Sequence, residues 1–410
     1  MAISLKKEFL ELISENIKED ILDVSKFAES VGTEIFLIGG VVRDLIINNP
    51  IKDIDIVVQA DAINFCRSLA ENLECEIVSE QENLRTAKVA FKSGNVIDFA
   101  STREENYVES GVLPIACNFG CLLSEDVKRR DFTINTLAIK LTGNDKFSLV
   151  DYFNGYNDIK NKKIRVLHDN SFIDDPSRII RALKFKVRFN FEIEERTYAL
   201  MQSYLCDVSK TMPLERIKSE LKQYFAINNN SLYPLIIKTN SYKLISDNPI
   251  TDINLDNFKL ISDFELFHKN DMWFVYVVLL IINSDFSLQR LNFNSTELKV
   301  IREVRELIAE KHSENLTNKE IYNMFDKLNN LSIAIYYLIT GSKTVERFLK
   351  ALKEIEVLIT GKDLIELGFI PSAYFSELFD KILDKKLNGE LKTKKDEINF
   401  VKQFLKKQTN

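Results

Sequence analysis

The chain has 410 residues, 45% of them hydrophobic, which is enough for two or three domains with their own cores. Its net charge of −6, from 55 Lys and Arg against 61 Asp and Glu, argues against a uniformly basic nucleic-acid binder. Basic residues nevertheless cluster at 156–188, with nine Lys or Arg against four Asp, and at 381–410, with nine Lys against four acids. Such clusters act locally, so an RNA partner stays open.

Composition also indicates the cell compartment. Five cysteines in a chain of this length do not form a disulfide framework, and no secretory signal precedes them, so a cytoplasmic protein is predicted. The one long apolar run, 272–282, is too short to cross a bilayer and predicts a buried helix. No membrane partner is expected.

The first strong pattern along the chain is a strand, a Gly-Gly turn and a helix. Residues 34–38 predict a short strand, and Gly39 and Gly40 allow the backbone to turn tightly. Residues 41–47 predict a helix whose free N–H groups suit a phosphate. Arg43 lies one turn inside that helix, within reach of the same anion.

Two carboxylates follow on a second predicted strand. Asp53 and Asp55 alternate with isoleucines, so both carboxylates are expected on one side of the strand. Two hard oxygen donors on one rigid edge suit Mg²⁺ that carries a nucleoside triphosphate. A metal site is therefore predicted at Asp53 and Asp55.

Further elements predict an α/β head with a small mixed sheet, followed by an all-α neck and body. Three more strands are expected, at 74–78, 86–91 and 95–99. After Asp174 the apolar residues recur at three- and four-residue spacing, which predicts helices. Turn-rich stretches suggest boundaries, and we expect a head at 1–141, a helical neck at 142–230 and a helical body and tail at 231–410.

Asp98 lies between apolar neighbours on one of these predicted strands, where an unpaired charge would be costly. A cationic partner is therefore expected beside it. The alternative is a carboxylate at a strand end that is bonded to the backbone.

The order of strand, Gly-Gly turn, helix and Asp-x-Asp strand resembles the catalytic signature of the DNA polymerase beta-like nucleotidyltransferase superfamily. Its fuller form GGVVRD, 39–44, is similar to the class II tRNA nucleotidyltransferase and bacterial poly(A) polymerase family. The resemblance extends over about residues 30–225. It implies a catalytic role for Asp53 and Asp55, and for Asp98 as a third carboxylate.

Two further segments of the head resemble motifs of this family. RRDFTIN, 129–135, resembles its RRDxxxN motif, and Asp131 is expected to cap a helix that begins at Phe132. Arg130 is assigned to the triphosphate, because a planar guanidinium clamps phosphate oxygens bidentately; a structural salt bridge is the alternative. Residues 103–114 resemble the loop implicated in the change of specificity from C to A, or are a polar loop without a role.

The segment DDPSRIIR, 174–181, is the most informative about the substrate. Asp and Pro predict the start of a helix, with Asp175 and Arg178 on one face. Cytosine and adenine both present an amino donor beside a ring-nitrogen acceptor, whereas uracil and guanine present the opposite order. A carboxylate and a guanidinium side by side would accept C and A, which resembles the family's fourth motif. Arg181, one turn on, is expected to contact base or phosphate.

Two other motifs carry structural roles by the same resemblance. DYFNG, 151–155, resembles a hinge between head and neck, and LERI, 214–217, resembles a segment that braces the nucleotide-reading helix.

Together with these residues, the resemblance implies template-independent addition of C and A nucleotides, from CTP and ATP, to the 3′ end of tRNA with Mg²⁺ as cofactor. By the same resemblance the neck would read the nucleotide, and the body and tail would bind the tRNA. A partial enzyme that adds only CC or only A, and a poly(A) polymerase, are alternatives with the same chemistry. A non-catalytic RNA-binding module is the alternative from another class.

Overall fold

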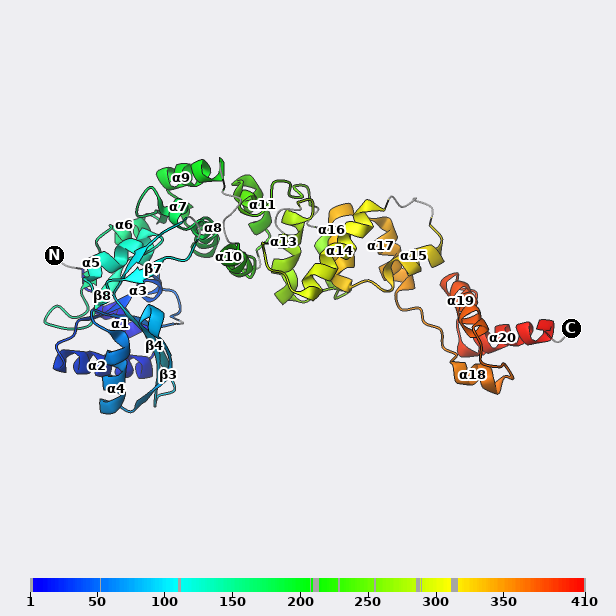
Figure 1. Ribbon diagram of the computed structural model, residues 1–410, viewed down its shortest axis with the longest axis horizontal. Helices are drawn as coiled ribbons and strands as arrows, with labels where there is room; N and C mark the ends of the chain where they lie inside the picture. The colour runs from blue at the N-terminus through cyan, green and yellow to red at the C-terminus, as the bar shows by residue number, and fades with distance from the viewer. Residues whose placement is uncertain are drawn as a thin grey trace. The chain divides into compact units, whose positions relative to one another are not determined.

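The structure is a computed structural model that describes residues 3–51, 53–109, 112–206, 208, 214–227, 229–253, 256–284, 288, 290–310 and 316–408. The chain divides into two compact units, residues 1–244 and 245–410. The first unit holds the strands, and the described part of the second is helical (Figure 1). The predicted order, an α/β head followed by helices, is confirmed.

The head is built on a seven-stranded sheet in the order β3-β4-β5-β2-β1-β8-β9. Strands β2 and β5 run parallel and the other neighbouring pairs antiparallel, so the predicted mixed sheet is confirmed. The strands are β1 (Ile35–Ile38), β2 (Asp55–Val58), β3 (Cys75–Gln81), β4 (Thr86–Phe91), β5 (Val96–Ser101), β8 (Ala138–Lys140) and β9 (Leu149–Val150). A separate hairpin is formed by β6 (Glu104–Asn106) and β7 (Ile115–Cys117).

One face of the sheet is covered and the other opens toward the candidate site. Helix α4 (Ala62–Asn72) contacts β3, β4 and β5. On β4 and β5 the residues Val89, Ile97 and Phe99 are buried, whereas Lys88 and Asp98 alternate with them and are at least partly exposed. This period of two places the charged side chains on the uncovered face.

Helices fill the rest of the first unit. They are α1 (Lys6–Leu12), α2 (Glu15–Ser30), α3 (Gly40–Ile46), α5 (Leu123–Asp126), α6 (Gly155–Lys160), α7 (Ser171–Asp174), α8 (Ser177–Phe189), α9 (Glu195–Cys206), α10 (Glu215–Phe225) and α11 (Leu232–Lys238). One departure from the predicted all-α neck is a two-residue parallel pair, β10 (Lys163–Ile164) with β11 (Glu192–Ile193).

The second unit contains α12 (Asn257–Asp263), α13 (Met272–Ile281), α14 (Ser295–Ala309), α15 (Asn318–Phe325), α16 (Asn330–Thr340), α17 (Lys343–Arg347), α18 (Gly361–Glu366), α19 (Tyr374–Leu387) and α20 (Lys394–Gln408). Helix α13 is buried almost throughout, as its apolar sequence predicts. Among the described residues, no helix combines the length and the apolar character that crossing a membrane requires.

Candidate active site

The predicted turn and helix form as expected. Gly39 follows β1 with φ = 72°, a conformation that favours glycine, and α3 begins at Gly40. A Cβ on residue 39 would lie 2.9 Å from Nη1 of Arg130, so a larger residue would displace that guanidinium. The turn is thereby adapted to the close approach of Arg130.

Arg130 reaches the turn because the segment before it is anchored in the core. Val127 and Leu123 pack against Phe36 and Ile38 of β1. The predicted helix at Phe132 is wrong: only a single 3₁₀ turn, Thr133–Asn135, forms there. Asp131 instead accepts hydrogen bonds from the Phe132 amide and the Asn135 side chain.

Arg130 lacks full compensation for its charge. Its Nη2 lies 3.2 Å from Asp126, which also pairs with Arg129. Burial lowers the pKa of the Arg130 guanidinium. Its buried Nε atom has no hydrogen-bond partner in the described part of the chain. A buried donor without a hydrogen bond is costly, so an anion that binds here and accepts from Arg130 would be stabilised.

Arg43 is buried as well, and lies over the ring of Phe189 at 4.5 Å. Its nitrogens bind Asp44 and the Asn135 side chain, the latter at 2.6 Å. Arg43 still lines the cavity described below. Its predicted contact with phosphate stays a prediction.

The three predicted carboxylates differ in their positions. Asp55 is the first residue of β2 and pairs directly with Asp98 of β5 in the parallel ladder. The strand itself begins at Asp55, so Asp53 lies two residues ahead of it and not on it as predicted. The predicted alternation is present, because Asp53 and Asp55 are exposed and Ile54, whose carbonyl accepts from the Asp98 amide, is buried between them. The cationic partner predicted for Asp98 is Lys88, whose Nζ lies 2.7 Å from Oδ1.

The electrostatics of Asp55 favour a cation. Burial in the concave wall raises its pKa, and the carboxylates of Asp98 and Asp53 raise it further, against Arg130 and Lys88. Within the described ranges no three Asp, Glu, His or Cys side chains converge on one point as a ready metal site. The donor chemistry of Asp55 and Asp98 still fits a hard divalent cation, with Lys88 now held by Asp98.

The larger of the two cavities that adjoin at this site, about 530 Å³, brings together residues from the turn, the hairpin and the neck. Its lining includes Gly39, Gly40, Arg43, Arg103, Glu105, Tyr107, Arg129, Arg130, Asp131, Asn135, Asp175, Arg178, Arg181, Phe185 and Arg216. Seven of the ten predicted site residues thus line one cavity, and Asp55 and Asp98 line the second.

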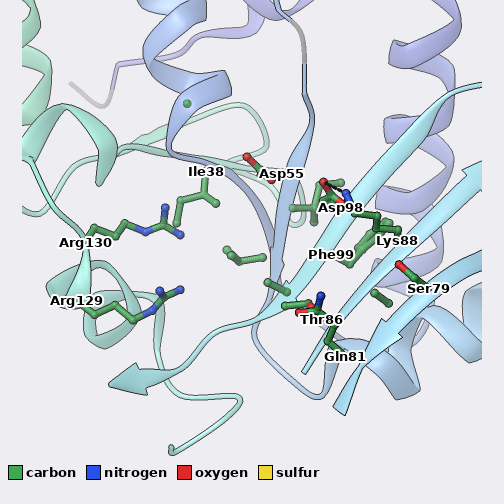
Figure 2. Close-up of a pocket in the computed structure, with 15 residues that line it drawn as sticks. Ile38, Asp55, Ser79, Gln81, Thr86, Lys88, Asp98, Phe99, Arg129 and Arg130 are labelled. Carbon is green, nitrogen blue, oxygen red and sulfur yellow. Dashed lines mark hydrogen bonds and ion pairs between the residues drawn. The ribbon is translucent and has the colours of Figure 1, made fainter. Parts of the chain in front are cut away.

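This smaller cavity, about 380 Å³, lies on the open face of the sheet. Figure 2 shows Arg129 and Arg130 extending into it from one side, with Asp98 and Lys88 on the other. The two cavities share Gly40, Arg129 and Arg130 in their linings.

The predicted base-reading pair is present and firmly held. Asp175 Oδ1 accepts hydrogen bonds from the amide and hydroxyl of Ser177 at the start of α8, so the capping role holds too. Its Oδ2 accepts from Arg216 of α10. Arg178 donates to Ser171, to the Arg129 carbonyl and to the Tyr107 hydroxyl.

Arg181 is engaged within the protein. Its Nε lies 2.8 Å from Asp131 and its Nη1 3.2 Å from Glu220, and the Asp131 charge raises its pKa despite burial. Three contacts escape the sequence analysis: Lys88 with Asp98, Tyr107 with Arg178, and Arg216 with Asp175. Only the first carried a signal, the strand alternation that demands a cation near Asp98.

Comparison with known proteins agrees with the fold of the head and of the whole chain. Residues 35–165 match the family model described as the poly A polymerase head domain. An A-adding tRNA nucleotidyltransferase of Geobacter sulfurreducens is 30% identical over 92% of this chain, which spans only 46% of that relative. The A-adding tRNA nucleotidyltransferase of Halalkalibacterium halodurans is 28% identical, covering 96% of this chain and 95% of its own.

Solved structures are similar over nearly the whole chain. A CCA-adding enzyme in an apo form superposes with a TM-score of 0.80, 27% identity and coverage of 97% of this chain and 98% of that one. The Thermotoga maritima CCA-adding enzyme complexed with tRNA superposes with a TM-score of 0.78 and 28% identity, covering 98% of this chain and 99% of that one.

Fold and site together define a nucleotidyltransferase with a polymerase beta-like head. More narrowly, residues 35–165 form a head of the poly A polymerase type, and the chain is similar to A-adding and CCA-adding tRNA nucleotidyltransferases, as its motifs indicate.

Proposed function

We propose that this protein adds C and A nucleotides to the 3′ end of tRNA from CTP and ATP, without a nucleic-acid template, and releases pyrophosphate. One observation carries the proposal: the cavity that holds Arg130 beside the Gly39 turn also holds Asp175 and Arg178. A phosphate-binding region and a base-reading pair in one cavity suit a nucleoside triphosphate.

Protein side chains take the place of a template in this scheme. Asp175 accepts a hydrogen bond from the amino group of C or A, and Arg178 donates one to the ring nitrogen. Uracil and guanine would bring a carbonyl to Asp175 and an N–H to Arg178, which leaves buried polar groups without partners. Arg130 and Arg43 hold the triphosphate.

The carboxylates Asp53, Asp55 and Asp98 serve the transfer itself, and we assign Mg²⁺ to Asp53 and Asp55. Bound there, Mg²⁺ would lower the pKa of the attacking 3′-hydroxyl and neutralise the leaving pyrophosphate. Asp98 positions the hydroxyl from the neighbouring strand. The raised pKa of Asp55 supports this assignment, since it reflects negative charge that a cation would relieve.

A second candidate is addition of A alone. It is favoured by two relatives named A-adding tRNA nucleotidyltransferases, which match this chain over more than nine tenths of its length. Against it stand relatives and solved structures named as CCA-adding enzymes. Either product uses the same residues.

The RNA partner is held through its phosphates, with little reading of bases. The helical neck and the body supply the contacts. The free state of all five cysteines supports a cytoplasmic location for the reaction.

Incubating the protein with tRNA that lacks its terminal A, together with labelled ATP and Mg²⁺, tests the activity. Incorporation with release of pyrophosphate is expected. Asp55→Ala should abolish incorporation yet leave tRNA binding nearly unchanged, because the carboxylate serves the transfer. Full activity of this variant would overturn the assignment of the site.

A further inference from the structure

The floor of the smaller cavity is formed by two rows of side chains that cross the sheet. In the first row Ser79 pairs with Lys88, Lys88 with Asp98, and Asp98 with Asp55. These four residues lie on adjacent strands and line the same cavity. The row therefore leads from a cation on β4 to the carboxylates proposed to carry the transfer.

The second row has no charged residue, and most of its side chains are small. It is formed by Gln81, Thr86, Ala100 and Val57, paired in the same ladders. Short side chains here leave room above the sheet, and the hydroxyl and amide at its outer end are suited to hydrogen bonds with a sugar. The floor is thus a shelf next to the carboxylates.

The ion pair of Lys88 with Asp98 contributes little to folding. The Lys88 side chain is 53% exposed and that of Asp98 37% exposed, and pairs of this kind stabilise proteins weakly. Lys88 is also attracted by Asp55 and Asp53, as its raised pKa reflects. Its ammonium group is held by carboxylates at the site of transfer while it stays accessible to a ligand.

The shared wall of the two cavities indicates how they divide the substrates. If the nucleotide fills the larger cavity, its reacting phosphate lies near Arg130, which borders both. The second reactant must then approach from the smaller cavity, with its hydroxyl at Asp55 and Asp98. From Lys88 to Asp55 the backbone of the row spans two strand spacings, roughly 10 Å. The charged ends of the two side chains lie closer together than the backbone does, at a separation of about the length of one nucleotide.

We infer that the smaller cavity binds the 3′-terminal nucleotide of the RNA and that Lys88 contacts the phosphodiester on its 5′ side. This inference rests on the proposed function and deepens it by naming the binding site of the second substrate. Lys88 leaves Asp98 for the phosphate when RNA binds, which frees Asp98 for the 3′-hydroxyl. A compact ammonium on a flexible stem suits such an exchange.

The test compares Lys88→Met with Lys92→Met, a control close by in the chain. Lys92 is 76% exposed, pairs with Glu74 and lies outside the cavity lining. Lys88→Met should raise the Kd for tRNA lacking its terminal A about tenfold, as loss of one charge-assisted hydrogen bond implies. The salt slope of binding should fall by about 0.7. The KM for ATP should change less than twofold, and Lys92→Met should change none of these.

A methylphosphonate in place of the phosphodiester before the last nucleotide gives the decisive comparison. It should weaken binding to the unaltered protein by the same factor as Lys88→Met, with no further loss when both changes are combined. Two results would contradict the contact between Lys88 and the phosphodiester. One is that the binding losses from the methylphosphonate and from Lys88→Met multiply when combined, and the other is that Lys88→Met alters only kcat. An unaltered protein that extends no tRNA would overturn the proposed function, and this inference with it.

Discussion

Oδ2 of Asp175 and Nε of Arg178 lie 4.0 Å apart, and each side chain is fixed by a partner outside the pair, Asp175 by Arg216 and Arg178 by Ser171. Both side chains are almost fully buried. In the proposed function, a carboxylate and a guanidinium held in this way would present a rigid edge to a base. A base with mismatched donors and acceptors would leave these buried groups without partners, which is how such a pair would discriminate between nucleobases.

Asp175→Ala should therefore reduce selectivity. The ratio of kcat/KM for CTP over UTP should fall roughly ten- to a hundredfold, the effect of losing a hydrogen bond to a charged partner. The melting temperature should fall too, because Arg216 loses its partner. Asp174→Ala, which alters the neighbouring carboxylate beside His168, serves as the control and should keep the ratio. A less stable Asp175→Ala protein with an unchanged ratio would leave only a structural role.

Tyr107→Phe tests whether the hairpin orients Arg178. The Tyr107 hydroxyl accepts from Arg178 at 3.1 Å and lies 3.3 Å from Glu105, which Arg103 and Arg129 hold. Loss of this hydrogen bond should lower the CTP over UTP preference about fivefold, or about 1 kcal/mol, at nearly constant melting temperature. The exposed Tyr198, changed to Phe, should leave the preference intact. If the unaltered protein, Tyr107→Phe and Tyr198→Phe have the same preference for CTP over UTP, the hairpin plays no part in base selection.

Gly155→Ala should destabilise the first unit. A Cβ there would stand 2.2 Å from the carbonyl oxygen of Thr133, and neither backbone can yield easily. We expect the free energy of unfolding to fall by about 3 kcal/mol and the melting temperature to fall by several degrees. Calorimetry measures both. Gly361→Ala is the matched control, because its Cβ would meet Phe375 only at 3.9 Å. A Gly155→Ala protein as stable as the control would show that the close approach relaxes at little cost.

Acid should lower the stability of the head by protonating Asp126. Burial raises the pKa of this carboxyl, but the charges of Arg130 and Arg129 and its hydrogen bonds outweigh burial and leave the pKa below its usual value. A lowered folded-state pKa stabilises the protein fully above the unfolded value and loses that contribution as pH falls through the folded one.

Asp126→Asn removes this titration. Urea unfolding should show a deficit of about 3 kcal/mol relative to the unaltered protein above about pH 5, since two arginines lose their charged partner. The deficit should shrink as pH falls below 4. A deficit that stays constant down to pH 3, within the range where both proteins fold, would exclude Asp126 as the acid-sensitive group.

Local signals explain what the sequence predicted well. The Gly-Gly turn, and the alternation that sets Asp55 and Asp98 opposite their isoleucine and phenylalanine neighbours, are properties of residues close in the chain. The start of β2 was predicted two residues too early, because where a strand starts depends on its pairing with β5 rather than on its own alternation.

The partners of the base-reading pair could not be predicted. Arg216 lies 41 residues from Asp175, and Tyr107 lies 71 residues from Arg178. These contacts depend on how α10 and the hairpin pack against α8, which no local pattern specifies. Lys88 was predictable only as an unidentified cation near Asp98.

The most direct test of the account follows the 3′ ends of three tRNAs that lack the last three, two or one nucleotides. Each is incubated with CTP, ATP, or both, and its ends are sequenced. The account predicts that all three are completed to CCA with both nucleotides, that CTP alone stops after two C, and that UTP and GTP are not used. Extension of only the last substrate, by a single A, would contradict addition of C, and no extension of any tRNA would contradict the account as a whole.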